Sequence, residues 1–91
     1  MYVQSAKLTF RLPYAASLKD KRSVCRGLID KLRHKFNVSV SEVEAQDVHQ
    51  KLVVGVSLVS GDAAHAQNCL DEIIRYAEQT ALAELLEVEV W

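Results

Sequence analysis

The sequence is poor in glycine, proline, cysteine and aromatic residues, and each shortage narrows what the protein can do. It has three glycines, one proline and two cysteines, and aromatic residues make up 7% of the chain. No apolar run approaches the ~20 residues of a transmembrane helix, so we expect no membrane partner. Cys25 and Cys69 form no C-x-x-C pair, which predicts reduced thiols in a cytoplasmic protein.

Motifs for catalysis and for cofactors are also missing. Residues 11–17 contain no glycine, so few free backbone N–H groups can converge there on an anion. No Ser-His-Asp set, P-loop or dinucleotide fingerprint occurs, and we predict a protein that is not an enzyme and holds no cofactor or metal. The stretch with Glu42, Glu44, Asp47 and His49 offers donor atoms for a divalent cation but no fixed ligand spacing, so its role stays open.

What remains is the composition of one folded domain. The 91 residues are 49% hydrophobic and 25% charged, which is ordinary globular usage and argues against disorder. A chain of this length buries roughly 60–65% of the surface that its unfolded form exposes. Residues 1–91 are therefore predicted to form a single soluble domain around one thin core.

Hydrophobic periodicity divides the chain into six elements. Alternation with a period of two predicts strands over residues 2–12, 38–44, 51–60 and 84–91. Helical spacing of apolar residues predicts helices over residues 18–36 and 63–79. The strand at 51–60 is apolar on both faces and is expected to lie centrally. The alternation of the strand at 38–44 slips at Ser41–Val43, which indicates a bulge or an edge strand.

Short polar residues mark the ends of the two helices. Ser17 and Asp20 resemble a capping box, and Asp62 is expected to cap the second helix. Asn37 is expected to end the first helix in the left-handed conformation that asparagine tolerates.

The order strand–helix–strand–strand–helix–strand predicts a ferredoxin-like α+β sandwich. Right-handed crossovers then place both helices on the same face of a four-stranded antiparallel sheet. The opposite face stays open. Lys7 and Arg11 point to that face, and we expect them to pair with Glu87 and Glu89 across the first and last strands.

Charge is distributed unevenly along the chain although the net charge is only −1. Residues 1–36 carry nine Lys/Arg and two acids, whereas residues 37–91 carry two Lys/Arg and ten acids. Such a split is a reason to look for an anionic partner on one side of the molecule.

The first helix carries most of the positive charge. At ~100° per residue its basic side chains form a strip about 60° wide beside the apolar face; they are Lys19, Arg22, Arg26 and Arg33. Guanidinium groups suit phosphate geometry, so this strip is the candidate nucleic-acid-binding site. The other interpretation is a solvated face that balances the acidic second half. Lys21 falls near the apolar side and is expected to extend its ammonium group to water.

Two runs of residues resemble a known family. Residues 17–22 (SLKDKR) and 36–40 (FNVSV), followed by Glu42 and by Gln46 and Asp47, are similar to the YlxP-like family of bacterial proteins of unknown function. The resemblance implies a ferredoxin-like fold and a cytoplasmic role near ribosomal RNA or a ribosome-associated factor, since the family's genes tend to lie among those for translation initiation and ribosome maturation. It assigns no catalytic residue.

The open sheet face supports an alternative. Val3, Val53, Val59 and Trp91 would lie on it and could form the interface of a homodimer, or of a module that senses a small molecule or binds a protein. Trp91 could equally cover the sheet edge of its own chain. Base stacking on the sheet is not expected, because the strand at 51–60 has no aromatic residue.

Overall fold

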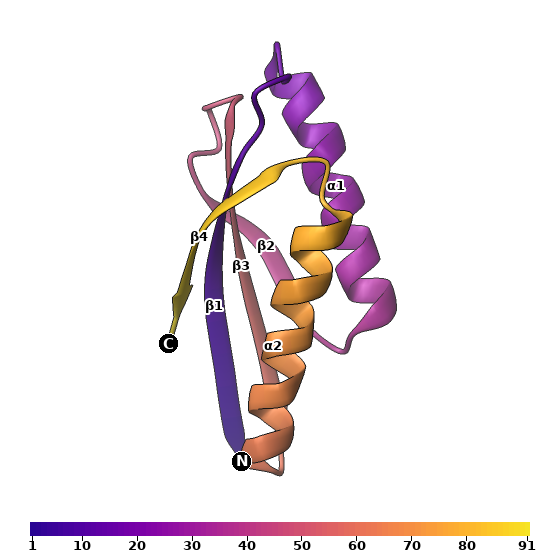
Figure 1. The fold of residues 1–91 in the computed structure, drawn as a ribbon, viewed down its shortest axis with the longest axis vertical. Coiled ribbons are helices and arrows are strands. Elements are labelled where there is room, and N and C mark those ends of the chain that lie inside the picture. Colours follow the sequence, from indigo (N-terminus) through magenta and orange to yellow (C-terminus); the bar gives the residue numbers. More distant parts are fainter.

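Six elements follow one another in the predicted order (Figure 1). The computed structural model describes all residues from 1 to 91. The strands are β1 (Tyr2–Arg11), β2 (Ser39–Glu44), β3 (Lys51–Ser60) and β4 (Glu84–Val90). The helices are α1 (Leu18–Lys35) and α2 (Ala63–Thr80). The sequence-based bounds are therefore correct to within one residue at every end.

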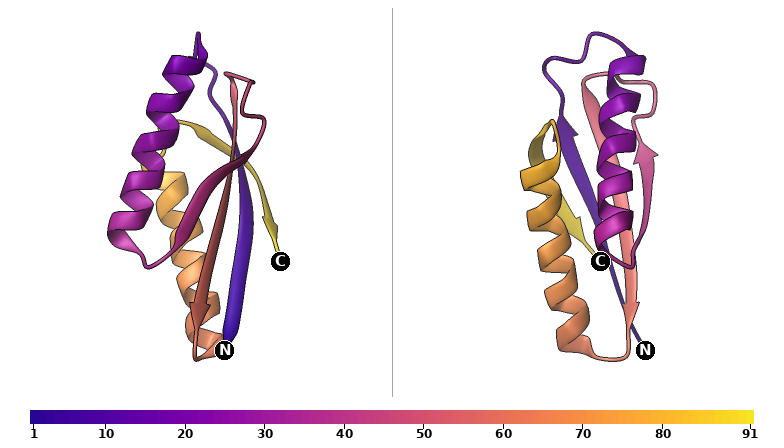
Figure 2. Two further views of the ribbon diagram at one scale, coloured as in Figure 1. Left: turned by 180° about the vertical axis from the view of Figure 1, so that it is seen from behind. Right: turned by 90° about the vertical axis from the view of Figure 1, so that its right-hand side faces the viewer.

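The four strands form one antiparallel sheet in the order β2-β3-β1-β4. The central strands β1 and β3 pair over their full length, from Tyr2 opposite Ser60 to Arg11 opposite Lys51. Both helices cover the same face of this sheet (Figure 2). The ferredoxin-like topology and the central position of β3 are thus confirmed, and β2 and β4 are the two free edges.

Side-chain caps fix where the helices begin. Ser17 Oγ accepts a hydrogen bond from the Asp20 N–H, and Asp62 Oδ1 accepts one from the His65 N–H. The end of α1 differs from the prediction at Asn37. Ala45 is the single non-glycine residue with a positive φ, so Asn37 is not left-handed. Instead, Phe36 is extended and its N–H donates to the Leu32 carbonyl.

Bulges interrupt both edge strands. In β2 the register shifts between Glu42 and Glu44, as the slip in the alternation predicted. Val43 is the extra residue, and it places Glu44 on the open face opposite Val53. A second shift, opposite Thr9 and Phe10 of β1, lies in β4. Bulges of this kind hinder the pairing of an edge strand with another chain.

The core lies between the sheet and the helices as one cluster of 17 buried residues. Its largest fully buried apolar side chains include Phe10, Leu32, Leu52, Leu70 and Ile73. Each such burial contributes roughly 1.5–3 kcal/mol to stability before conformational entropy is counted. No helix is both long enough and apolar enough to cross a membrane.

Candidate functional site

The four predicted binding residues of α1 all reach solvent. Lys19, Arg22, Arg26 and Arg33 are exposed. None of them lies within 4.0 Å of a carboxylate, because the four ion pairs of the chain involve other cations. We call these four residues the basic ridge. Their charge is not neutralised by direct contact with the protein's own acids, which leaves it free for an external anion.

Arg33 fixes the position of the basic ridge relative to the sheet. Its Nη2 donates to the carbonyl of Val40 in β2 at 3.0 Å, so the ridge lies on the flank of α1 next to the β2 edge. A guanidinium has five N–H donors, and this bond uses one of them. The remaining donors are available to a ligand at that edge.

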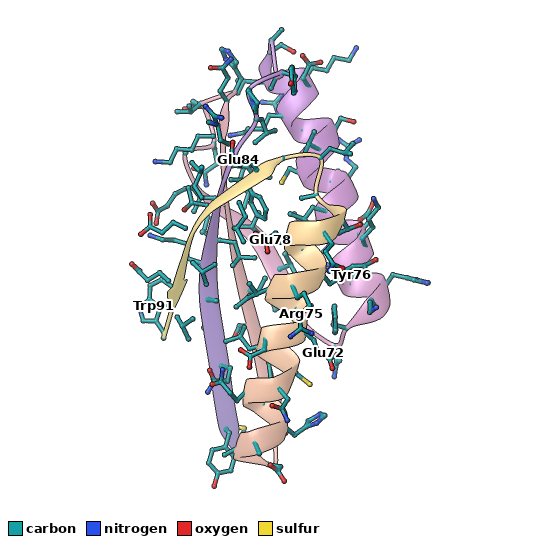
Figure 3. The ribbon with its side chains drawn as sticks, in the orientation of Figure 1. Glu72, Arg75, Tyr76, Glu78, Glu84 and Trp91 are labelled. Atoms are coloured by element: carbon teal, nitrogen blue, oxygen red, sulfur yellow. The ribbon has the colours of Figure 1, made fainter.

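The other flank of α1 has a different role. Lys35 Nζ lies 4.5 Å from the ring centre of Tyr76 in α2, which is a cation–π contact. Tyr76 also meets Phe36 edge-on, with ring centres 5.7 Å apart. Figure 3 shows Tyr76 on the side of α2 that faces α1. These contacts join the two helices, and they lie apart from the basic ridge.

The edge of the sheet far from the basic ridge is acidic. Glu84, Glu87 and Glu89 belong to β4, whereas the basic ridge lies beside β2. Two strands separate these edges, about 14 Å from β2 to β4 at the usual strand spacing. Glu42 and Glu44 belong to β2 itself, but both lie in ion pairs with lysines outside the ridge.

Lys21 behaves differently from the prediction that its ammonium group reaches water. It is 1% exposed, and Nζ donates to the carbonyls of Ala45, Val48 and Lys51 at 2.6–3.1 Å. Glu42 Oε2 lies 2.8 Å from Nζ but accepts no hydrogen bond, because the three ammonium protons serve the carbonyls. Lys21 thus ties α1 to the β2–β3 connection.

The acidic residues of the β2–β3 hairpin point to opposite faces of the sheet. Glu42 lies on the helix side with Lys21, and Glu44 lies on the open face, 2.7 Å from Lys7. Nowhere in the chain do three or more His, Cys, Asp or Glu side chains form a group that could hold a metal ion. Of the four residues grouped by the sequence, Glu42 and Glu44 are therefore partners of two different lysines.

The ion pairs on the open face agree only in part with the expected ones, since Lys7 does pair with Glu89 but its shorter pair is with Glu44. Lys7 pairs with Glu44 at 2.7 Å and approaches Glu89 only to 4.0 Å. Arg11 pairs with Glu84 at 2.7 Å, and Glu87 forms no ion pair within 4.0 Å. The β2 bulge explains the main difference, because it turns Glu44 to the open face within reach of Lys7. The bond to Glu44 is the largest cause of the raised pKa of Lys7.

The same arrangement removes one predicted interface residue. Val53 is 1% exposed, since its neighbours on the open face are Thr9 on one side and Glu44 on the other. It cannot contact a partner, so its prediction as an interface residue is wrong. Val3, Val59 and Trp91 are 52%, 62% and 66% exposed. The first two are paired neighbours on β1 and β3.

A groove of about 420 Å³ lies on the open face. Its floor includes Gly55 of β3, and the ideal Cβ of an alanine at this position would lie 2.9 Å from Val43 Cγ1. Val43 of the bulge and Trp91 at the end of β4 also line the groove. The Trp91 N–H donates to the Ser5 carbonyl, and Figure 3 shows its side chain at the end of β4, away from α2.

A second hollow, of about 500 Å³, lies where β2 begins. Arg33 and Asn37 line it together with Ser39 and Ser57, and both serines also line the first groove. The two hollows are therefore adjacent. Sequence analysis missed them because no single segment carries them: their walls come from α1 and all four strands or their ends.

Comparison with known structures agrees with the topology. A designed protein with a ferredoxin fold, LFR1 1, superimposes with a TM-score of 0.63 at 11% identity, covering 99% of this chain and 85% of that one. A putative chlorite dismutase, TA0507, superimposes with a TM-score of 0.51 at 15% identity, over 99% of this chain and 43% of that one. At such low identity the likeness shows the fold alone.

Comparison of sequences identifies the family. The uncharacterized protein YlxP of Bacillus subtilis (strain 168) is 33% identical over 64 residues, which cover 70% of each chain. Residues 3–90 match the family model described as "Protein of unknown function (DUF503)". The predicted resemblance to a YlxP-like family is thereby confirmed, and the chain belongs to the DUF503 family.

Proposed function

We propose that this protein is a non-catalytic accessory protein of the cytoplasm that binds the phosphate backbone of structured RNA, ribosomal RNA first of all, through the basic ridge. The observation that carries the proposal is the set of four exposed cations on one flank of α1 with no carboxylate within 4.0 Å. The role near the ribosome that the YlxP-like resemblance implies supports the same partner.

The length of the basic ridge suits a nucleic-acid backbone. Lys19 and Arg33 are 14 positions apart in α1, which is about 21 Å at 1.5 Å per residue. One strand of a DNA duplex places a phosphate about every 3.4 Å along its axis, and the A-form duplex of RNA is more compact. The ridge could therefore follow at least about six phosphate steps and contact a subset of them. Contacts of this kind position a protein without reading sequence.

The decisive experiment reverses charge at two places in the same chain. The double variant Arg22→Glu/Arg26→Glu changes the ridge, and Lys31→Glu/Arg75→Glu makes the same change of net charge at exposed residues outside it. Affinity for a ribosomal RNA fragment is measured for both. We expect the first variant to lose at least about tenfold, since hydrogen bonds to charged groups contribute ~1.5–3 kcal/mol each.

If the basic ridge is the binding site, the RNA affinity of the control variant should stay within about twofold of the wild-type value. The reason is that exposed charges outside the ridge are screened by salt within about 8–10 Å. Equal losses in the two variants would mean that net charge alone matters. Undiminished binding by the ridge variant would refute the proposal.

A further inference from the structure

The two hollows form one path from α1 to the open face of the sheet. The hollow beside Arg33 shares Ser39 and Ser57 with the groove that reaches Trp91. Trp91 follows β4, which is three strand positions from β2, so the backbones at the two ends of the path are about 14 Å apart at the usual strand spacing of 4.7–4.9 Å. The side chains of Arg33 and Trp91 themselves line the two hollows, so the space between them suits a single nucleotide with its neighbouring phosphate.

The two ends of this path differ in chemistry. At one end Arg33 offers guanidinium donors beyond the one used on Val40, which suits a phosphate. At the other end lies the indole ring of Trp91, a residue that is 66% exposed. Lys7 Nζ lies 5.9 Å from its centre. Such a ring suits an aromatic base, because every base has a π-face.

Charge orients an occupant of the path in one direction. Near Trp91, the carboxylates of Glu44 and Glu89 surround the single ammonium group of Lys7. A phosphate would be repelled there, whereas a neutral base would not. The groove between Val43 and Trp91 also offers the hydroxyls of Ser41 and Ser57. Ser41 Oγ donates to the Glu42 carbonyl and Ser57 Oγ accepts from Ser5, so Ser41 can accept from the edge of a base and Ser57 can donate to it.

We propose that this path binds an unpaired nucleotide of RNA, with its phosphate on Arg33 and its base against Trp91. The inference rests on the proposed function and adds that the RNA must have an unpaired base, since a base inside a duplex keeps its faces stacked. The sequence argued against stacking on the sheet because β3 has no aromatic residue. Here the aromatic ring comes from the end of β4.

The test uses the full chain and two RNA probes, a short oligoadenylate and a blunt-ended RNA duplex without a loop. Trp91 is the single tryptophan, so its fluorescence reports on this site alone. We expect the oligoadenylate to quench Trp91 and the duplex to bind without quenching. Trp91→Ala should weaken oligoadenylate binding by about 5- to 150-fold, the range that one stacked base contributes, and leave duplex binding unchanged.

Two variants serve as controls. Trp91→Phe retains an aromatic face and should recover most of the oligoadenylate affinity. Tyr14→Ala removes an aromatic ring that is 96% exposed and lines neither hollow, and it should change nothing.

The outcomes separate this inference from the function on which it rests. If the basic ridge binds oligoadenylate while Trp91 is neither quenched nor required, the nucleotide site is refuted and the RNA function stands. If neither probe binds, both fall. A dimer in which Trp91 is shielded from a soluble quencher would also overturn the inference, because a second copy would then occupy the groove.

Discussion

Replacing Lys21 with methionine should destabilise the protein more than any change on its surface. Methionine keeps the apolar stem but removes the ammonium that three carbonyls share. Glu42 Oε2, which is buried, would lose its counter-charge. Removing one partner of a buried ion pair costs about 3–5 kcal/mol. That is a large part of the total of about 5–14 kcal/mol that a chain of 91 residues has.

The loss is measured by urea unfolding followed by far-ultraviolet circular dichroism. With a slope of about 1.5 kcal/mol/M, Lys21→Met should lower the midpoint by about 2–3 M. The matched control is Lys31→Met, because Lys31 is an exposed lysine of the same helix. Its free energy of unfolding should stay within about 0.5 kcal/mol of the wild-type value. Adding Glu42→Gln to Lys21→Met should restore part of the loss, because it removes the unpaired buried charge.

A Lys21→Met protein as stable as the Lys31→Met control would refute the reasoning. It would mean that water can hydrogen-bond to the carbonyls of Ala45, Val48 and Lys51 in place of Lys21 without any loss of stability. The backbone of Ala45 is left-handed, with a φ of 56°, and this conformation costs about 1–2 kcal/mol for a residue with a Cβ. The bond from Lys21 to its carbonyl offsets this strain.

Three further results are expected from the same contacts. Burial raises the pKa of the Cys25 thiol, so a thiol reagent should modify half-buried Cys69 first and Cys25 only on unfolding; equal rates would contradict this. Gly55→Ala alone should lower the free energy of unfolding, because its Cβ would clash with Val43. In a Val43→Ala background, which lacks the clash, the same change should be neutral or stabilising by about 0.5–1 kcal/mol. Additive effects of the two changes would contradict this contact. The hydrogen bond to Glu44 raises the pKa of Lys7 above 10.5, so the Lys7–Glu44 pair stabilises the fold below that pH and is lost as pH rises through the raised value. Urea unfolding of wild type and Lys7→Met should therefore converge at high pH, and a constant difference would contradict the pair.

The fold could be predicted because its signals are local. Alternation in β1 and β3, helical spacing in α1 and α2, and the caps Ser17 and Asp62 each lie within one segment. The slip in β2 was also visible, because a bulge interrupts the alternation of its own strand.

The sites could be predicted only where one helix carries them. The basic ridge belongs to α1 alone, so its exposure followed from the helical wheel. Lys21 also lies on α1, but its partners come from the β2–β3 connection, which the wheel does not place. Val53 is buried between Thr9 and Glu44, which belong to two other strands. The path from Arg33 to Trp91 joins residues far apart in the sequence.

The most direct test of the central claim is the salt dependence of RNA affinity. The logarithm of the association constant of a blunt-ended RNA duplex is measured against the logarithm of salt concentration. With the value of about −0.9 per contact that holds for a DNA duplex, four phosphate contacts from the basic ridge should give a slope of about −3.6, and Arg26→Gln should reduce its magnitude by about 0.9. A slope near zero, or one that Arg26→Gln leaves unchanged, would contradict the account.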